Sequence, residues 1–250
     1  MRKGIYILPN LLTTGNLMCG FWSIVSVFQE QFYFAAVAIL LASVFDAFDG
    51  KVAKLSRATS KFGMQYDSLA DLVSFGIAPA LLAFSWALRP YGKFGWLAAF
   101  TFVACGAIRL ARYNVMASSG ETKYFKGVPI PVAAAMIALT ILLYLRLVET
   151  GWIKDIVILV MIYVLAFLMV SSIRYFSFKE LGLAKRKPIS SFVFVVLSLI
   201  VIVMEPVVVL SVFILFYVLS GPVSMLLAWR KKRVLRRMEP IPEEDLVIRG

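Results

Sequence analysis

Four aspartates stand close together in an otherwise largely apolar stretch of the sequence. Asp46 and Asp49 are three residues apart, and Asp67 and Asp71 are four apart. At helical spacing, the members of each pair share one face of a helix. Unit charges about 4 Å apart repel by roughly 4 kcal/mol at an effective dielectric constant near 20, so such a cluster needs protons or a bridging cation. Carboxylates favour hard ions such as Mg²⁺, Mn²⁺ or Ca²⁺. Four of them on two helices therefore predict a site for two divalent ions.

The residues around these aspartates suit a phosphate-bearing ligand. Gly50, Ala53 and Gly63 are small and leave room for a ligand close to the ions, and basic residues border the same hairpin. These basic residues are Lys51, Lys54, Arg57 and Lys61. Lysine and arginine side chains bind phosphate oxygens through charge-assisted hydrogen bonds. The chain has no histidine, so a carboxylate is the natural general base for chemistry at this site.

The elements that carry the aspartates are predicted to be membrane helices. Of the 250 residues, 61% are hydrophobic and 16% charged, against about 45–50% and about 25% in soluble domains. Apolar stretches near the required length of about 20 residues predict an all-α, polytopic transmembrane helical bundle that forms one integral membrane domain over residues 1–250. We expect about eight spans, or six if the last pair is peripheral. The expected spans are 9–28, 33–53, 68–88, 94–116, 128–147, 152–173, 189–204 and 207–229.

The distribution of basic residues predicts how the bundle is oriented. With both termini in the cytosol, 22 of the 26 lysines and arginines fall on or beside cytosolic connections; the other four are Arg89, Lys93, Arg146 and Lys154. This is a strong positive-inside signal. At 1.5 Å per residue, Asp46 lies roughly 20 Å from the outer end of its helix. The aspartates are therefore expected at the cytosolic boundary of the cell membrane, and the basic, then acidic, tail at 230–250 near anionic lipid.

The aspartate motif resembles the signature of a known family. The pattern D-x-x-D-G-x-x-A-[R/K], followed by eight residues and G-x-x-x-D-x-x-x-D, is similar to that of the CDP-alcohol phosphotransferases. It runs from Asp46 to Asp71, with Lys54 where the family usually has arginine. Lysine keeps the charge but lacks the bidentate fork. Segments at 7–25, 67–80, 109–114 and 126–135 look like the phosphatidylserine synthase branch, which extends the resemblance over about the first 135 residues.

The resemblance implies an activity and a set of site residues. It implies a phosphatidyltransferase that makes phosphatidylserine and CMP from CDP-diacylglycerol and L-serine. The metal ligands would be Asp46, Asp49, Asp67 and Asp71, with Asp71 also the catalytic base for the serine hydroxyl. The contacts to the CDP-lipid would be Gly50, Ala53, Lys54, Ser60 and Gly63. The resemblance also implies a catalytic core of about 5–175, a metal and nucleotide motif at 46–71, and a homodimer. It implies no nucleic-acid partner.

The serine substrate requires a partner for its carboxylate. Arg109 and Arg112 stand at the cytosolic end of the fourth expected span, and a guanidinium is well suited to a carboxylate. Either arginine could equally be ordinary positive-inside flank. Asn16 and Thr13 of the first span are further candidates to line the site, although hydrogen bonding between helices explains them equally well.

Three other functions remain open at this point. A sibling enzyme would use glycerol 3-phosphate or an inositol phosphate as acceptor, or an archaeal-type lipid as donor. A divalent-cation transporter would also need aspartates, but would more naturally place them near the membrane midplane. A structural helical scaffold leaves the aspartate cluster without a purpose.

Overall fold

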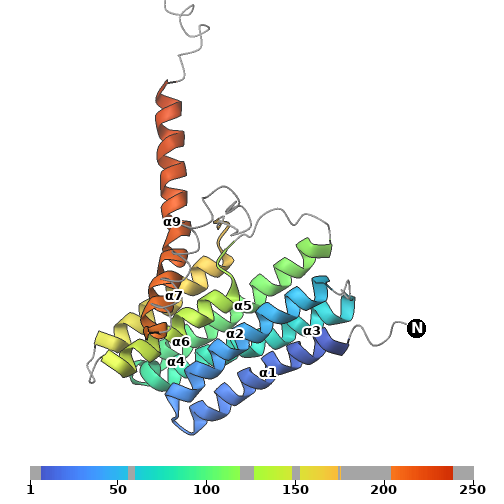
Figure 1. The fold of residues 1–250 in the computed structure, drawn as a ribbon. Coiled ribbons are helices and arrows are strands. Elements are labelled where there is room, and N and C mark those ends of the chain that lie inside the picture. The colour runs from blue at the N-terminus through green and yellow to red at the C-terminus, as the bar shows by residue number, and fades with distance from the viewer. Residues whose placement is uncertain are drawn as a thin grey trace, which may run out of the picture.

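A computed structural model describes residues 7–55, 60–118, 127–147, 153–173, 175 and 204–238. All regular elements in these ranges are helices (Figure 1). The first two form an antiparallel hairpin, α1 (Ile7–Phe28) and α2 (Phe32–Leu55). Glu30, with φ of 58°, makes the tight turn between them. The two helices expected at 9–28 and 33–53 are thus present in the structure.

The third helical rod runs without interruption from Lys61 to Tyr91 but changes its winding along the way. Its parts are α3 (Lys61–Asp71), η2 (Leu72–Ile77), α4 (Ala78–Ala83), η3 (Phe84–Leu88) and η4 (Arg89–Tyr91). Both η2 and η3 are π-helical, and a proline follows each by two residues, Pro79 and Pro90. Proline has no backbone N–H and interrupts the regular i→i−4 ladder. The wider turns therefore occur where the sequence breaks α-helical hydrogen bonding.

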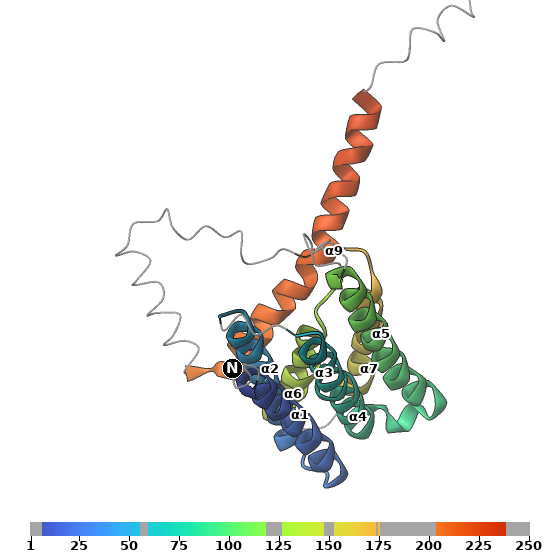
Figure 2. The same cartoon turned by 90° about the vertical axis from the view of Figure 1, so that its right-hand side faces the viewer.

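Four further helices complete the described fold. They are α5 (Lys93–Ser118), α6 (Ile130–Leu147), α7 (Ile153–Val170) and α9 (Pro206–Met238). Helices α1 to α7 form one bundle, whereas α9 packs against it with its first half and extends beyond it with its second (Figures 1 and 2). An ion pair between Arg146, in α6, and Glu205 holds the start of α9 on the bundle.

The bundle interior is built largely from small residues, which allow helices to approach closely. Ala35, Ala38 and Ala42 of α2 are fully buried. At Gly20 of α1, a Cβ atom would lie 2.7 Å from the Cα of Ser74, so the backbones of α1 and η2 are nearly in contact. Membrane helices pack in this way because lipid provides no hydrophobic force to bring them together.

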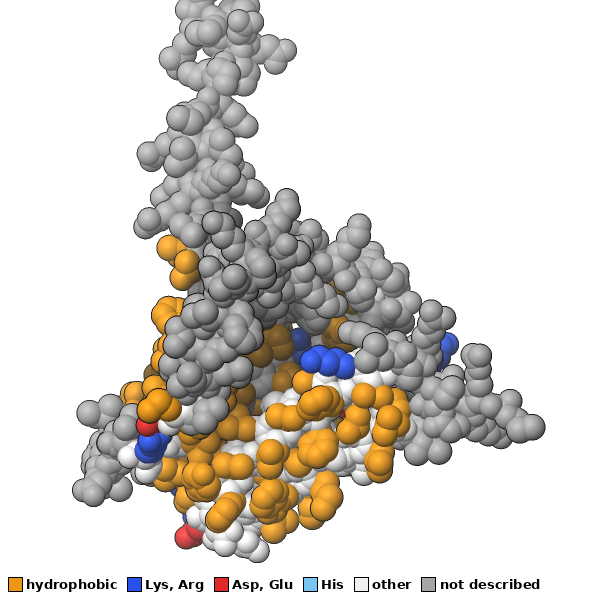
Figure 3. Space-filling view, in the orientation of Figure 1, with side chains coloured by type: hydrophobic (Ala, Val, Ile, Leu, Met, Phe, Trp, Pro, Cys, Tyr) orange, Lys and Arg blue, Asp and Glu red, His pale blue; other side chains and the backbone are white. Residues whose placement is uncertain are grey.

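The outer surface is apolar, as a lipid environment requires. Large exposed side chains, such as Phe21, Phe100 and Phe167, lie on the outside of the bundle, and orange hydrophobic atoms cover much of the face in Figure 3. Within the described ranges, five helices are long and apolar enough to cross a membrane: 8–28, 32–52, 61–91, 93–116 and 206–226. The apolar helices at 130–146 and 155–170 are shorter. The predicted all-helical membrane protein is confirmed for the described ranges, and the expected span at 189–204 lies almost entirely outside them.

Candidate metal centre

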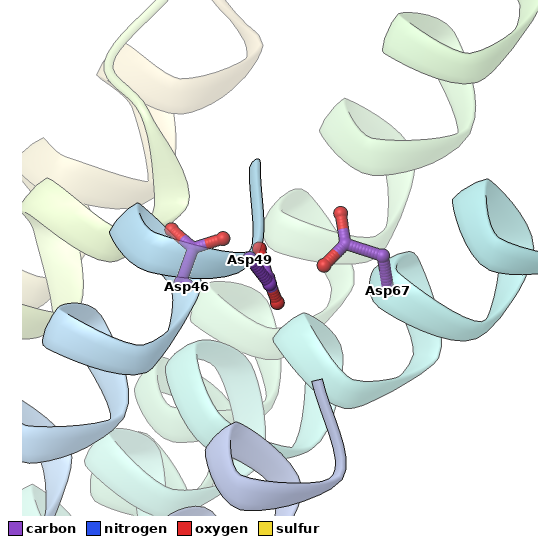
Figure 4. Close-up of side chains that lie close together, drawn as sticks. All are labelled: Asp46, Asp49 and Asp67. Carbon is purple, nitrogen blue, oxygen red and sulfur yellow. The ribbon is translucent and has the colours of Figure 1, made fainter. Parts of the chain in front are cut away.

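Three of the four aspartates converge from two helices. Asp46 and Asp49 lie in the last turns of α2, and Asp67 lies in the second turn of α3, after the Ser60 cap that starts that helix. One carboxylate oxygen from each lies within 4.8 Å of the others. In Figure 4 the three side chains face a common space, with Asp49 between the other two. Separations of this size allow a cation to contact all three carboxylates.

Burial makes this concentration of charge costly. Asp49 is 5% exposed and Asp71 8% exposed, while Asp46 and Asp67 are partly buried. In the described part of the chain, none of the four aspartates forms an ion pair with a lysine or arginine. Each carboxylate loses hydration and repels its neighbours, so the ionised cluster is unfavourable unless a cation compensates it.

Helix α1 supplies hydrogen bonds that orient two of the carboxylates. Thr13 Oγ1 lies 3.0 Å from Asp49 Oδ2, to which it donates. Asn16 Nδ2 donates to Asp71 Oδ1 at 3.0 Å, and Ser74 Oγ donates to the carbonyl oxygen of Asn16 at 3.0 Å. Hydrogen bonds of this kind to a metal-binding carboxylate fix its rotamer and the direction of its remaining lone pairs.

Several buried polar atoms at the site have no hydrogen-bond partner among the described residues. They include Asp67 Oδ1, Asn16 Oδ1 and Arg109 Nε. Buried polar atoms are almost always paired, so unpaired ones ask for an explanation. An oxygen-rich set with an unpaired carboxylate oxygen fits a hard divalent cation. The residues present therefore fit the metal that the aspartate spacing predicts.

Asp71 is adjacent to the three-carboxylate cluster but has different surroundings. It lies at the end of α3, where the rod changes to π-helical winding. It interacts electrostatically with Asp46 and Asp67 and also with Arg109. Asn16 occupies only one of its two carboxylate oxygens. Its predicted roles as a metal ligand and as a base stay predictions.

The residues predicted to contact the CDP-lipid divide into three groups. A Cβ atom on Gly50 would meet nothing within 4 Å, so the space beside it is open. Gly63 and Ser60 instead form the start of α3, where Ser60 Oγ accepts a hydrogen bond from Gly63 N at 2.9 Å. Ala53 and Lys54 belong to the last turn of α2, and their side chains lie outside the described part of the structure.

The two predicted serine-binding arginines differ in their contacts. Arg109 is 8% exposed and interacts electrostatically with Asp71. Arg112 donates from Nη1 to the carbonyl of Val170 at 3.1 Å and from Nη2 to that of Ser171 at 3.4 Å. Arg112 thus binds the end of α7, and Arg109 is the arginine at the aspartates.

Sequence reasoning missed one residue near the site, Ser74, whose hydroxyl donates to the carbonyl oxygen of Asn16. Ser74 stands three residues after Asp71, and that spacing was a usable signal.

The fold and this site define an integral membrane protein with a carboxylate cluster suited to divalent cations. The family model of the CDP-alcohol phosphatidyltransferases matches residues 6–229. The chain belongs to this family. The predicted resemblance is confirmed, including its branch, by relatives named CDP-diacylglycerol–serine O-phosphatidyltransferase.

Three relatives illustrate the range of this similarity. A CDP-diacylglycerol–serine O-phosphatidyltransferase from Helicobacter pylori is 35% identical over 222 residues, which cover 89% of this chain and 92% of the relative. The enzyme of the same name from Bacillus subtilis is 35% identical over 69% of this chain and 92% of its own length. An archaetidylserine synthase from Methanothermobacter thermautotrophicus is 36% identical over 67% of this chain and 69% of its own length.

Proposed function

We propose that the protein transfers a phosphatidyl group from CDP-diacylglycerol to L-serine, which yields phosphatidylserine and CMP. The observation that carries the proposal is the cluster of Asp46, Asp49 and Asp67, within the family motif, with the unpaired Asp67 Oδ1 buried beside it. The names of the relatives supply the acceptor, serine.

The reaction needs a divalent cation, and three side chains are suited to hold it. Asp46, Asp49 and Asp67 would bind one or two ions, Mg²⁺ or Mn²⁺, with Ca²⁺ as the alternative. Bound ions would neutralise charge on the transferred phosphate and on the departing CMP. Thr13 would keep one oxygen of Asp49 turned away, so that its other oxygen faces the metal.

The chain's own residues then account for the proton transfer and the orientation of serine. The serine hydroxyl oxygen forms a bond to the phosphorus that carries the diacylglycerol. The bond from that phosphorus to the CMP phosphate oxygen breaks, and its electron pair leaves with CMP. Asp71 takes the hydroxyl proton through the oxygen that Asn16 leaves free. A carboxylate within hydrogen-bond reach of the nucleophile meets the requirement for a general base.

Arg109 is our choice of partner for the serine carboxylate. Its guanidinium is buried, has an unpaired Nε and lies within electrostatic range of Asp71. The unpaired Asn16 Oδ1 is an acceptor for the serine ammonium group. Arg109 would then hold the carboxylate of serine and Asn16 its ammonium group, so that the serine hydroxyl is directed towards Asp71. Arg112 retains α7 through backbone carbonyls, and its predicted contact with serine stays a prediction.

The membrane arrangement proposed with this function follows from the charge distribution. We infer eight spans with both termini in the cytosol, a site that faces the cytosol of the cell membrane, and a basic tail at 230–250 near anionic lipid. A site at that boundary lets the lipid tails stay in the bilayer while the nucleotide remains in water. The homodimer remains an expectation drawn from the family.

An acceptor panel tests the function directly. Purified full-length protein in liposomes with labelled CDP-diacylglycerol and Mg²⁺ or Mn²⁺ is offered serine, glycerol 3-phosphate, inositol or inositol phosphate, and CMP release is followed. We expect release with serine alone. Release with another acceptor and not with serine would overturn the proposed acceptor.

One specific observation favours a second donor. The archaetidylserine synthase relative shares 36% identity with this chain, so an archaeal-type CDP-lipid belongs in the same panel. Ligand protection separates the enzyme from a cation transporter, because CMP raises the melting temperature of an enzyme in the presence of divalent metal. A protein that responds to the metal alone, with no effect of CMP, would fit the transporter instead.

A further inference from the structure

Asn114 is the last residue of the segment 109–114, and it has no part in the proposed reaction. Its side chain is partly buried and reaches from α5 to α3. Nδ2 of Asn114 donates to Oγ of Ser68 at 2.9 Å, and the same nitrogen lies 3.5 Å from Oε1 of Gln65. Asn114 thus binds the helix that carries Asp67 and Asp71, on the residues that flank Asp67.

The Ser68 hydroxyl can take part in two hydrogen bonds at once. It has one proton, which it donates to the carbonyl oxygen of Met64 at 3.1 Å, one turn earlier in α3. Its lone pairs remain available, so it accepts the proton of the Asn114 amide. Loss of either side chain therefore breaks the bond between the two helices.

The helical rod that begins with α3 and the helix α5 form a long antiparallel hairpin, whose arms run side by side (Figures 1 and 2). Its closed end contains Gly92, with φ of 51°. Ser68 and Asn114 are 46 positions apart in the sequence and lie towards the open end. Because the chain joins the two arms only at the closed end, side-chain contacts have to set their separation at the open end.

The two residues proposed to act on serine lie on different arms of this hairpin. Asp71 comes three residues after Ser68 in α3, and Arg109 comes five residues before Asn114 in α5. At 1.5 Å per residue these steps are about 4.5 Å and about 7.5 Å along the helices. Both steps lead away from the open end, because the arms are antiparallel. The bond between Ser68 and Asn114 therefore joins the arms close to both groups.

We propose that Asn114 is a positioning residue, which sets the distance between the Asp71 carboxylate and the Arg109 guanidinium by holding α5 on α3. This inference rests on the proposed function, in which Arg109 binds the serine carboxylate and Asp71 accepts the hydroxyl proton.

The metal cluster does not depend on this bond. Its three carboxylates lie on α2 and α3, and α3 has its own hydrogen bonds to α1, between Thr14 and Tyr66 and between Asn16 and Asp71. Loss of Asn114 therefore displaces α5 relative to α3 and leaves the carboxylates in place. The expected result is slower transfer to serine with unchanged metal binding.

Steady-state kinetics of the full-length protein in liposomes test this role. We expect kcat to fall about tenfold in Asn114→Ala and in Ser68→Ala, because a small displacement of reacting groups lowers the rate steeply. The KM for serine and the Mg²⁺ concentration for half-maximal CMP release are expected to stay within about twofold, since the groups that bind serine and metal are retained. An unchanged kcat in Asn114→Ala would overturn the proposal, and so would a Mg²⁺ requirement that rises as much as kcat falls.

A double-mutant cycle tests whether Asn114 acts through Ser68. In a Ser68→Ala background, Asn114→Ala is expected to change kcat by less than about twofold, because the two residues share one bond and their effects are not additive. A second tenfold loss would overturn the proposal. Ser68→Thr keeps the hydroxyl, and we expect it to retain the wild-type kcat. Ser211→Ala is the matched control: Ser211 of α9 is also partly buried and donates to the carbonyl four residues earlier, Val207 O, at 2.6 Å, and we expect wild-type kinetics.

Spin labels measure the separation of α3 and α5 without any substrate. Cys19 and Cys105 are replaced by alanine, and labels are attached to Lys61→Cys and Ala111→Cys, both at exposed positions. We expect a broader distance distribution when Asn114→Ala is added, and an unchanged distribution would overturn the proposal. If the protein with Asn114 intact releases no CMP with serine, the proposed function fails, and the spin-label distances still decide whether Asn114 holds the two helices together.

Discussion

At the scale of single residues, the site combines charges that repel each other with polar side chains that orient them. Asp49 and Asp71 each accept a hydrogen bond from α1, whereas Asp67 keeps a buried oxygen without a partner. The first two carboxylates are held by the protein, and the third is available for a cation. Metal binding at this cluster would therefore be coupled to helix packing through the same few atoms.

Asp67→Asn separates the metal role from a structural role. The amide removes one of the repelling charges, so in EDTA we expect a melting temperature equal to or above that of the wild type. Mg²⁺ is expected to raise the melting temperature of the wild type only. CMP release by the variant is expected to fall at least about 100-fold, which is the upper part of the range seen when metal-site partners are lost. An equal Mg²⁺-dependent rise in the variant would contradict the ligand assignment.

Thr13→Val tests the hydrogen bond that orients Asp49. Valine keeps the shape and loses the donor, so the carboxylate is free to rotate away from the metal. We expect the Mg²⁺ concentration for half-maximal CMP release to rise about tenfold, as for other partners of metal ligands. Thr140→Val is the control, because the hydrogen bonds of Thr140 among the described residues stay within α6 and α7, to Met136 O and Met161 Sδ. A wild-type Mg²⁺ dependence in Thr13→Val would show that Asp49 needs no orienting donor.

At the scale of elements, the aspartates meet because α1 packs closely on the aspartate-bearing rod, with Gly20 against the backbone of Ser74. The π-helical turn after Asp71 brings Ser74 against Gly20 and the carbonyl of Asn16. Single π-turns often mark functional sites. Here the turn joins the aspartate-bearing rod to the helix that orients its carboxylates.

Two glycines on neighbouring helices are expected to respond in opposite ways to alanine. Gly20→Ala places a methyl group 2.7 Å from the Cα of Ser74, and such overpacking typically destabilises by about 1–3 kcal/mol. Gly50→Ala meets open space, so the melting temperature is expected to stay unchanged while the KM for CDP-diacylglycerol rises, if the nucleotide occupies that space. Thermal unfolding and kinetics of both variants provide the check. A stable Gly20→Ala protein would refute the close α1–η2 contact.

At the scale of the whole molecule, the two ends of the helical bundle differ in the charged residues that they carry. The site lies where α2 ends and α3 begins, whereas the Arg146–Glu205 ion pair joins the last turn of α6 to the start of α9. The distribution of basic residues in the sequence favours a cytosolic location for the end of the bundle that carries the site. The lipid-facing surface is correspondingly apolar along the bundle (Figure 3).

Cysteine labelling tests the proposed orientation. Cys19 and Cys105 are replaced by alanine, and a single cysteine is introduced at Lys61 or Lys93, both exposed. In intact cells, a membrane-impermeant maleimide is expected to label Lys93→Cys, whereas Lys61→Cys reacts only after the membrane is opened. The reverse pattern would place the aspartates on the outer side of the membrane.

The sequence by itself determined the membrane-helical class, the positions of most described helices and the aspartate motif, because hydrophobic length and helical spacing are local properties. It could not determine that Thr13 would donate to Asp49, that Asn16 would donate to Asp71, or that Arg112 would donate to the carbonyl of Val170. These contacts join residues 36, 55 and 58 positions apart. Only the tertiary structure decides them, because they depend on how whole helices rotate and cross. Small residues and broken backbone hydrogen bonds along the helices determine that rotation and crossing.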